Sequence, residues 1–196
     1  MRRVNKPDSS IILQDTLTYK VGGDNKKLAN ALCEEQHNIC AYTETYLGRS
    51  DKKDIEHFNP TLKNTSDDSY QNWFLVKAQW NNEKSSKWED YQPILHPTDS
   101  TIESRIIYFE GEYIAASSDD EEALNLISLI KLDDPELAIE RRYYLENLKE
   151  NLELSGKSAQ QCIDFLLTTR PSLVYFIRAL EEELNVTVNF DLLQNT

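Results

Sequence analysis

Five polar side chains whose types and order suit the hydrolysis of a phosphodiester lie in the first half of the chain. Glu56 and His57 are neighbours, Asn72 follows His57 by 15 residues, and Asn81 opens a segment that ends at Lys84. Hydrolysis near neutral pH needs a base that deprotonates water and a cation that offsets the charge of the transition state. A neutral imidazole suits the first task, because its reference pKa is about 6.5. We therefore expect His57 to be the general base.

The cation is expected to be one hard divalent metal. Glu56 offers a carboxylate and Asn81 a neutral carboxamide oxygen. Mg²⁺ commonly takes one or two protein ligands and keeps its other positions for water and phosphate. Glu56 and His57 point to opposite faces of a regular strand, so both reach one metal only near a strand end, where the strand twists. We expect Glu56 and Asn81 to bind Mg²⁺ or Mn²⁺.

Two more residues are expected to support this chemistry. Asn72 is expected to tie the long loop at 59–71 through backbone hydrogen bonds. Lys84 follows Asn81 by about one helical turn and is expected to contact the substrate phosphate. Taken singly, a Glu-His pair in a strand is more often structural, and an asparagine near a helix start is usually a cap. The residues taken together, in this order, favour a metal site.

Two strands and a helix are needed to position these side chains. The apolar pattern predicts strands at 54–58 and 73–79, a short helix at 81–87 and a further short strand at 39–42. We therefore expect an α+β fold in which a ββα-metal finger, at about 36–90, sits on a mainly helical body.

The body is expected to hold a helix ahead of the finger and a hairpin with further helices after it. The first domain is then 1–95, and 96–196 is a partner-binding region. The expected elements are a helix at 25–37, a hairpin at 105–116, and helices at 123–130, from Pro135 to Gly156, after Ser158, and at 172–184.

Charge and cysteine content bear on the partners. The chain of 196 residues has a net charge of −13. Residues 1–95 hold 13 basic and 14 acidic side chains, whereas 96–196 hold 8 and 20. The first part can approach phosphate and the second repels it. The acidic part either faces a basic partner protein or is a solvated surface that aids solubility. Three cysteines and no export signal favour a cytoplasmic protein.

Six motifs between residues 25 and 145 extend the pattern beyond the finger. They lie at 36–44, 55–60, 72–85, 95–97, 108–113 and 137–142. With these motifs the chain resembles the HNH endonuclease subunits of Septu-type and retron-associated anti-phage systems. The resemblance implies a Mg²⁺-dependent HNH endonuclease that works with an ATPase of the ABC/SMC class. The acidic part would then dock either on that ATPase or on a larger assembly with a reverse transcriptase and its DNA.

One departure from the family pattern concerns zinc. Many members hold a structural zinc with two Cys-x-x-Cys pairs, and the matching positions here are Cys40, Thr43, Lys77 and Trp80. One thiolate cannot build a four-ligand zinc site. We expect no structural zinc, with Trp80 and Tyr42 packing in its place.

Two alternatives stay open beside a DNA endonuclease. The first is an RNase on the same finger that cuts a host RNA such as tRNA. The second is a degenerate finger that serves only as a scaffold subunit. The lost zinc ligands and the acidity favour a scaffold, and the intact Glu56, His57 and Asn81 argue against it.

Overall fold

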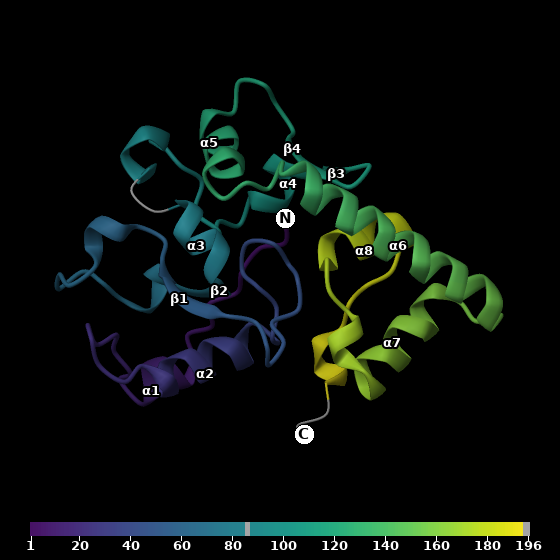
Figure 1. Cartoon of the computed structure of the whole chain (residues 1–196), viewed down its shortest axis with the longest axis horizontal. Coiled ribbons are helices and arrows are strands. Elements are labelled where there is room, and N and C mark those ends of the chain that lie inside the picture. Colours follow the sequence, from purple (N-terminus) through teal and green to yellow (C-terminus); the bar gives the residue numbers. More distant parts are fainter. Residues whose placement is uncertain (85–86, 194–196) are drawn as a thin grey trace.

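The computed structural model describes residues 1–84 and 87–193. It combines helices with two small antiparallel sheets, so the expected α+β class is confirmed (Figure 1). No helix in those two ranges has the length and apolarity that crossing a bilayer requires.

The first sheet pairs β1 (Lys53–His57) with β2 (Trp73–Lys77), close to the strands predicted from the sequence. β2 is buried at every position but its last, as its apolar sequence demands. β1 is buried only at its last two residues, Glu56 and His57. The end of β1 therefore carries two polar side chains into the interior beside an apolar strand.

Helix α3 (Ala78–Lys84) follows β2 without a loop. It begins three residues earlier than predicted, because the apolar run that suggested a strand to residue 79 continues as the first turn of the helix. Residues 85–86 of the predicted helix lie outside the described residues, and a 3₁₀ turn follows at Lys87–Tyr91.

Ahead of β1, the chain forms α1 (Ile11–Gln14) and α2 (Lys26–Glu35). The strand expected at 39–42 is wrong, because this segment turns back on itself. The N–H of Cys40 donates to the carbonyl of Thr45 at 2.9 Å, and the N–H of Glu44 donates to the carbonyl of Cys40 at 3.0 Å. A single bridge between Ile39 and Tyr46 is all the pairing that remains.

The predicted hairpin is present as β3 (Ile106–Phe109) and β4 (Glu112–Ala115), after the short helix α4 (Ile102–Arg105). Together with α5 (Glu121–Leu129) it packs into the same hydrophobic cluster as the finger. This first cluster draws on residues from 1 to 132. Apolar packing thus continues past residue 95, and the domain boundary expected there stays a prediction.

A second hydrophobic cluster, drawn from residues 137–193, holds the three helices α6 (Pro135–Ser155), α7 (Ala159–Thr169) and α8 (Ile177–Leu184). These helices gather on one side of the molecule (Figure 1). Trp80 and Tyr108 contact both clusters and so join them.

The helix ends in this part follow the sequence signals, with one exception. Asp134 caps α6, Gly156 ends it in the left-handed region, and Ser158 forms the predicted capping box. The helix predicted at 172–184 begins only at residue 177. Phe176 has a φ of 52° and its N–H donates to the carbonyl of Glu44 at 2.8 Å, so it cannot continue a helix.

The turn of the hairpin rests on α6 through two adjacent arginines. Buried Arg141 donates to the carbonyl of Gly111, and Arg142 donates to the carbonyl of Glu110 at 3.1 Å. The Arg141 guanidinium also lies 4.5 Å from the centre of the Tyr113 ring. Gly111 has a φ of 95°, and a Cβ there would stand 2.9 Å from the carbonyl oxygen of Ala138. The close approach of hairpin and helix therefore requires glycine.

We expect Gly111→Ala to lower the free energy of unfolding by about 2–4 kcal/mol, since it adds overlap with the backbone to the strain of a positive φ. Gly156→Ala is the matched control, because Gly156 has a φ of 65° and no atom within 4 Å of an added Cβ. The control should lower the free energy of unfolding by about 1 kcal/mol, from the strain of the positive φ alone. Urea unfolding followed by circular dichroism measures both. Equal losses would show that the contact with α6 contributes nothing.

Candidate active site

A cavity of about 90 Å³ lies where the end of β1 meets α3. Glu56 and His57 come from the strand, Asn81 and Lys84 from the helix, and Lys63 from the loop between the strands. Four of the five site residues expected from the sequence therefore meet at one cavity. Glu56 and His57 both reach it although they are neighbours on a strand, because they occupy the strand end.

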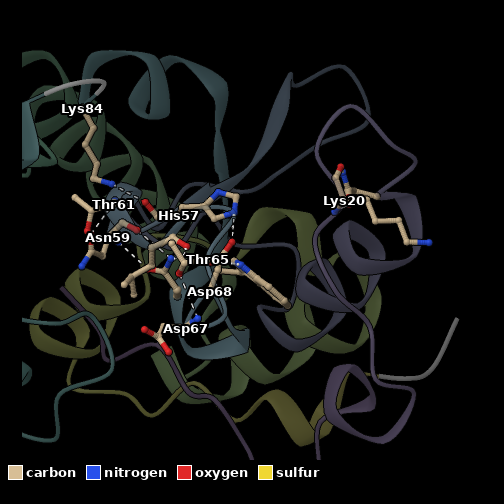
Figure 2. A network of polar contacts seen from close by, with 12 residues as sticks. Lys20, His57, Asn59, Thr61, Thr65, Asp67, Asp68 and Lys84 are labelled. Atoms are coloured by element: carbon tan, nitrogen blue, oxygen red, sulfur yellow. Dashed lines mark hydrogen bonds and ion pairs between the residues drawn. The ribbon is translucent and has the colours of Figure 1, made fainter.

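The imidazole of His57 is 4% exposed and faces the carboxylate of Asp68. His57 Nε2 lies 3.1 Å from Asp68 Oδ2 (Figure 2). The approach does not have hydrogen-bond geometry, so Nε2 is without a hydrogen-bond partner among the described residues. The edge of the Tyr19 ring packs against the imidazole, with 4.5 Å between centroids.

Protonation of His57 is set by opposing influences. Burial lowers the pKa of His57, and the Asp68 carboxylate raises it in part. The ammonium groups of Lys63 and Lys84 lower the pKa further. With a pKa below its usual value, the imidazole is neutral at pH 7 and can accept a proton from water.

Asp68 contacts His57 at this site, and the sequence did not point to it. Its Oδ1 accepts hydrogen bonds from Asn72 Nδ2 at 3.0 Å and from Trp73 Nε1 at 2.7 Å. Two donors thus fix the carboxylate, and its other oxygen faces His57. In the sequence, Asp68 is an acidic residue in a polar loop without periodicity. Many solvent-exposed loops have the same pattern, so it does not mark a site.

Asn72 makes hydrogen bonds to the backbone of the loop at 59–71, as predicted from the sequence. Its Oδ1 accepts from the N–H of Asn59 at 2.7 Å, and its Nδ2 donates to the carbonyl of Asn59 at 3.0 Å. It does not line the cavity, but its Nδ2 donates to the Asp68 carboxylate, whose other oxygen faces His57. Its part in catalysis stays a prediction.

Glu56 and Lys84 form a buried ion pair, with side chains 4% and 2% exposed. Lys84 Nζ donates to Glu56 Oε1 and to the carbonyls of His57, at 2.9 Å, and Phe58, at 2.7 Å. Tyr42 donates its hydroxyl to the same carboxylate oxygen at 3.3 Å. Burial raises the pKa of Glu56 and lowers the pKa of Lys84, and the attraction between the two charges opposes both shifts.

The phosphate contact expected of Lys84 does not fit this geometry. All three donors of an ammonium group are used inside the protein. Lys63 lines the same cavity and is exposed. It is therefore the better placed cation for a phosphate oxygen.

Two residues that line the cavity carry side-chain oxygen atoms of the kind that a hard divalent cation binds. Glu56 supplies a carboxylate and Asn81 a carboxamide, and Asn81 Nδ2 donates to Asp54 Oδ2 at 3.0 Å. The described part of the chain has no group of three His, Cys, Asp or Glu side chains that would hold a metal by itself. Such a sparse oxygen set suits Mg²⁺ or Mn²⁺, which share their coordination with water and phosphate.

The four positions that hold zinc in the resembling family make other contacts here. Cys40 is buried and its Sγ accepts the N–H of Lys77 at 3.4 Å. The hydroxyl of Thr43 lies 2.7 Å from that of Thr45. The Trp80 ring packs against both hydrophobic clusters.

Comparison with known families identifies the segment that contains the cavity. Residues 40–88 match a family model, and that family is HNH endonuclease. The match covers about a quarter of the chain and includes every site residue expected from the sequence. No curated protein and no solved structure matches the chain. The HNH match supports nuclease chemistry for this segment and says nothing of the helical part.

We expect Asp68→Asn to lower the pKa of His57 further, because it removes the carboxylate that favours the protonated imidazole. His57 should then stay neutral to lower pH, and the acid limb of any nuclease pH profile should move to lower pH. NMR titration of the His57 ring in metal-free protein measures the shift.

Asp67→Asn is the matched control, since Asp67 is the exposed neighbour of Asp68 and is not paired with His57. It should leave the pKa of His57 almost unchanged. An unchanged pKa in Asp68→Asn would contradict the assigned contact.

Proposed function

We propose that this chain is a metal-dependent endonuclease that hydrolyses phosphodiester bonds in nucleic acid. The observation that carries the proposal is the single cavity at which Glu56, His57 and Asn81 meet, inside a segment that matches the HNH endonuclease family. A buried neutral imidazole beside two oxygen ligands is the set of groups that this hydrolysis needs.

The residues divide the chemistry between them. His57 takes the proton from the attacking water, and the nearby Asp68 carboxylate favours the protonated imidazole that results. Glu56 and Asn81 would hold Mg²⁺ or Mn²⁺, which offsets negative charge on the phosphate and on the leaving oxygen when bound. Lys63, on the exposed side of the cavity, contacts a phosphate oxygen.

The biological setting is part of the same proposal. We place the chain in the cytoplasm, as the nuclease effector of a bacterial anti-phage complex of the Septu or retron-associated kind, with DNA favoured as substrate. The support is the resemblance of motifs on both sides of the HNH match. The proposed partner is an ABC/SMC-like ATPase, and the assembly can include a reverse transcriptase with its DNA.

We expect His57→Ala to lower cleavage by about 10²–10⁴-fold, the usual cost of losing a general base. The assay offers DNA and total RNA, tRNA included, to the purified complex with Mg²⁺, after chelation, and after Mg²⁺ or Mn²⁺ is returned. The two substrates decide between the DNase and the RNase.

His37→Ala is the control for this experiment, because it removes an imidazole that stacks on Phe190, outside the cavity. It should keep wild-type activity. Full activity of His57→Ala, or activity that survives chelation, would contradict the assignment of His57 as the general base of a metal-dependent nuclease. No cleavage by the wild-type complex on any substrate would favour the scaffold subunit.

The exposed face of α6 is where we expect a partner to dock. It presents Glu146 and Glu150 together with two exposed apolar side chains, Tyr143 at 62% and Leu154 at 87%. Acidic and apolar side chains on one face fit a basic partner surface with an apolar centre. Glu182, by contrast, is already paired with Arg178 at 2.6 Å.

Glu146→Lys with Glu150→Lys should therefore reduce co-purification with an ABC/SMC-like ATPase encoded beside this chain. The same change of charge at Glu89 and Asp90, two exposed acids of the first part, is the control and should have little effect. If both pairs leave assembly unchanged, the acidic face is a solvated surface.

A further inference from the structure

An open groove of about 510 Å³ runs between α2 and β1 and leads to the cavity of His57. The groove and the cavity share three wall residues, Ile55, Lys63 and Asn81. Tyr19 also lines the groove, and its ring is the one that packs edge-on against His57. The groove and the cavity therefore lie side by side.

The charge of this groove is opposite to that of the chain. Three lysines, Lys26, Lys53 and Lys63, line it, and Asp54 is its one acidic wall residue. None of the three lysines forms an ion pair with a described residue, whereas the Asp54 carboxylate accepts a hydrogen bond from Asn81. In a protein of net charge −13, this local excess of unpaired cations needs a reason.

We propose that this lysine groove, formed by Lys26, Lys53 and Lys63, binds the backbone of one nucleic acid strand and leads it into the cavity. The proposal rests on the proposed nuclease function. Consecutive phosphates of one strand can lie along a cationic groove and place the next phosphodiester at His57. A duplex has a second phosphate backbone, which the acidic remainder of the chain would repel. We therefore expect a single strand to bind more tightly than a duplex.

Lys63 has a special place because it lines both groove and cavity. Its Nζ lies 5.2 Å from the centre of the Tyr19 ring, which positions the ammonium between the two spaces. A phosphate bound at Lys63 would be the last phosphate of the strand before the cavity. The groove then sets the direction from which the strand enters.

The experiment measures binding in the His57→Ala background, so that cleavage cannot interfere. Labelled single-stranded DNA, single-stranded RNA and duplex DNA of one sequence are titrated at low ionic strength and followed by fluorescence anisotropy. Lys26→Glu with Lys53→Glu changes the groove. Lys27→Glu with Lys52→Glu is the matched control, since these exposed neighbours make the same change of charge outside the groove.

We expect the groove variant to bind a single strand about 10-fold or more weakly, and the control to change binding much less. The slope of log affinity against log salt should fall from about −2, for three phosphates on a single strand, to about −0.7. The RNA and DNA arms show which sugar the groove accepts. Equal losses in both variants, tighter binding of duplex, or no binding of any nucleic acid would overturn the proposal.

Failure of the groove can be told apart from failure of the nuclease function. The groove variant is also made in the wild-type background. If cleavage depends on His57 but this variant binds and cuts normally, only the proposal for the groove is rejected. If the groove variant loses binding but the wild-type complex cuts nothing, the groove stands and the nuclease assignment falls.

Discussion

The ammonium of Lys84 is bound by the carboxylate of Glu56 and by the backbone carbonyls of His57 and Phe58, and the local structure depends on this contact. It ties the last residue of α3 to the end of β1. Because both charges are buried, removing either one leaves the other uncompensated, at a cost of about 3–5 kcal/mol. The pair thus fixes the strand end that carries His57, and it fixes the helix that carries Asn81.

The same contact shapes the chemistry of the cavity. The ammonium of Lys84 is one of the two cations that lower the pKa of His57, and a divalent ion held by Glu56 would add positive charge with the same effect. Helix α3 also carries Trp80, which packs against both hydrophobic clusters. One short helix therefore contributes a proposed metal ligand, the buried cation and the link to the helical part.

Much of this arrangement was predictable because its causes are local. The apolar run of β2, the Pro135 start of α6 and the capping box at Ser158 are properties of short segments. The rest depends on partners distant in the sequence. The carbonyl of Glu44 stops a helix at Phe176, and Asp68 acquires a role only where its loop folds onto His57. Lys84 was expected to contact the substrate phosphate, because nothing in the sequence shows that its ammonium binds Glu56 in the interior.

Paramagnetic broadening of histidine ring signals by Mn²⁺ reports where a divalent ion binds. The chain has three histidines, and only His57 shares a cavity with Glu56 and Asn81. His37 stacks on Phe190 and His96 packs against Phe58. Substoichiometric Mn²⁺ should broaden His57 first, and Asn81→Ala should weaken that effect while the other two signals stay as they are. A His57 signal that stays sharp, or three signals that broaden together, would contradict a metal site at this cavity.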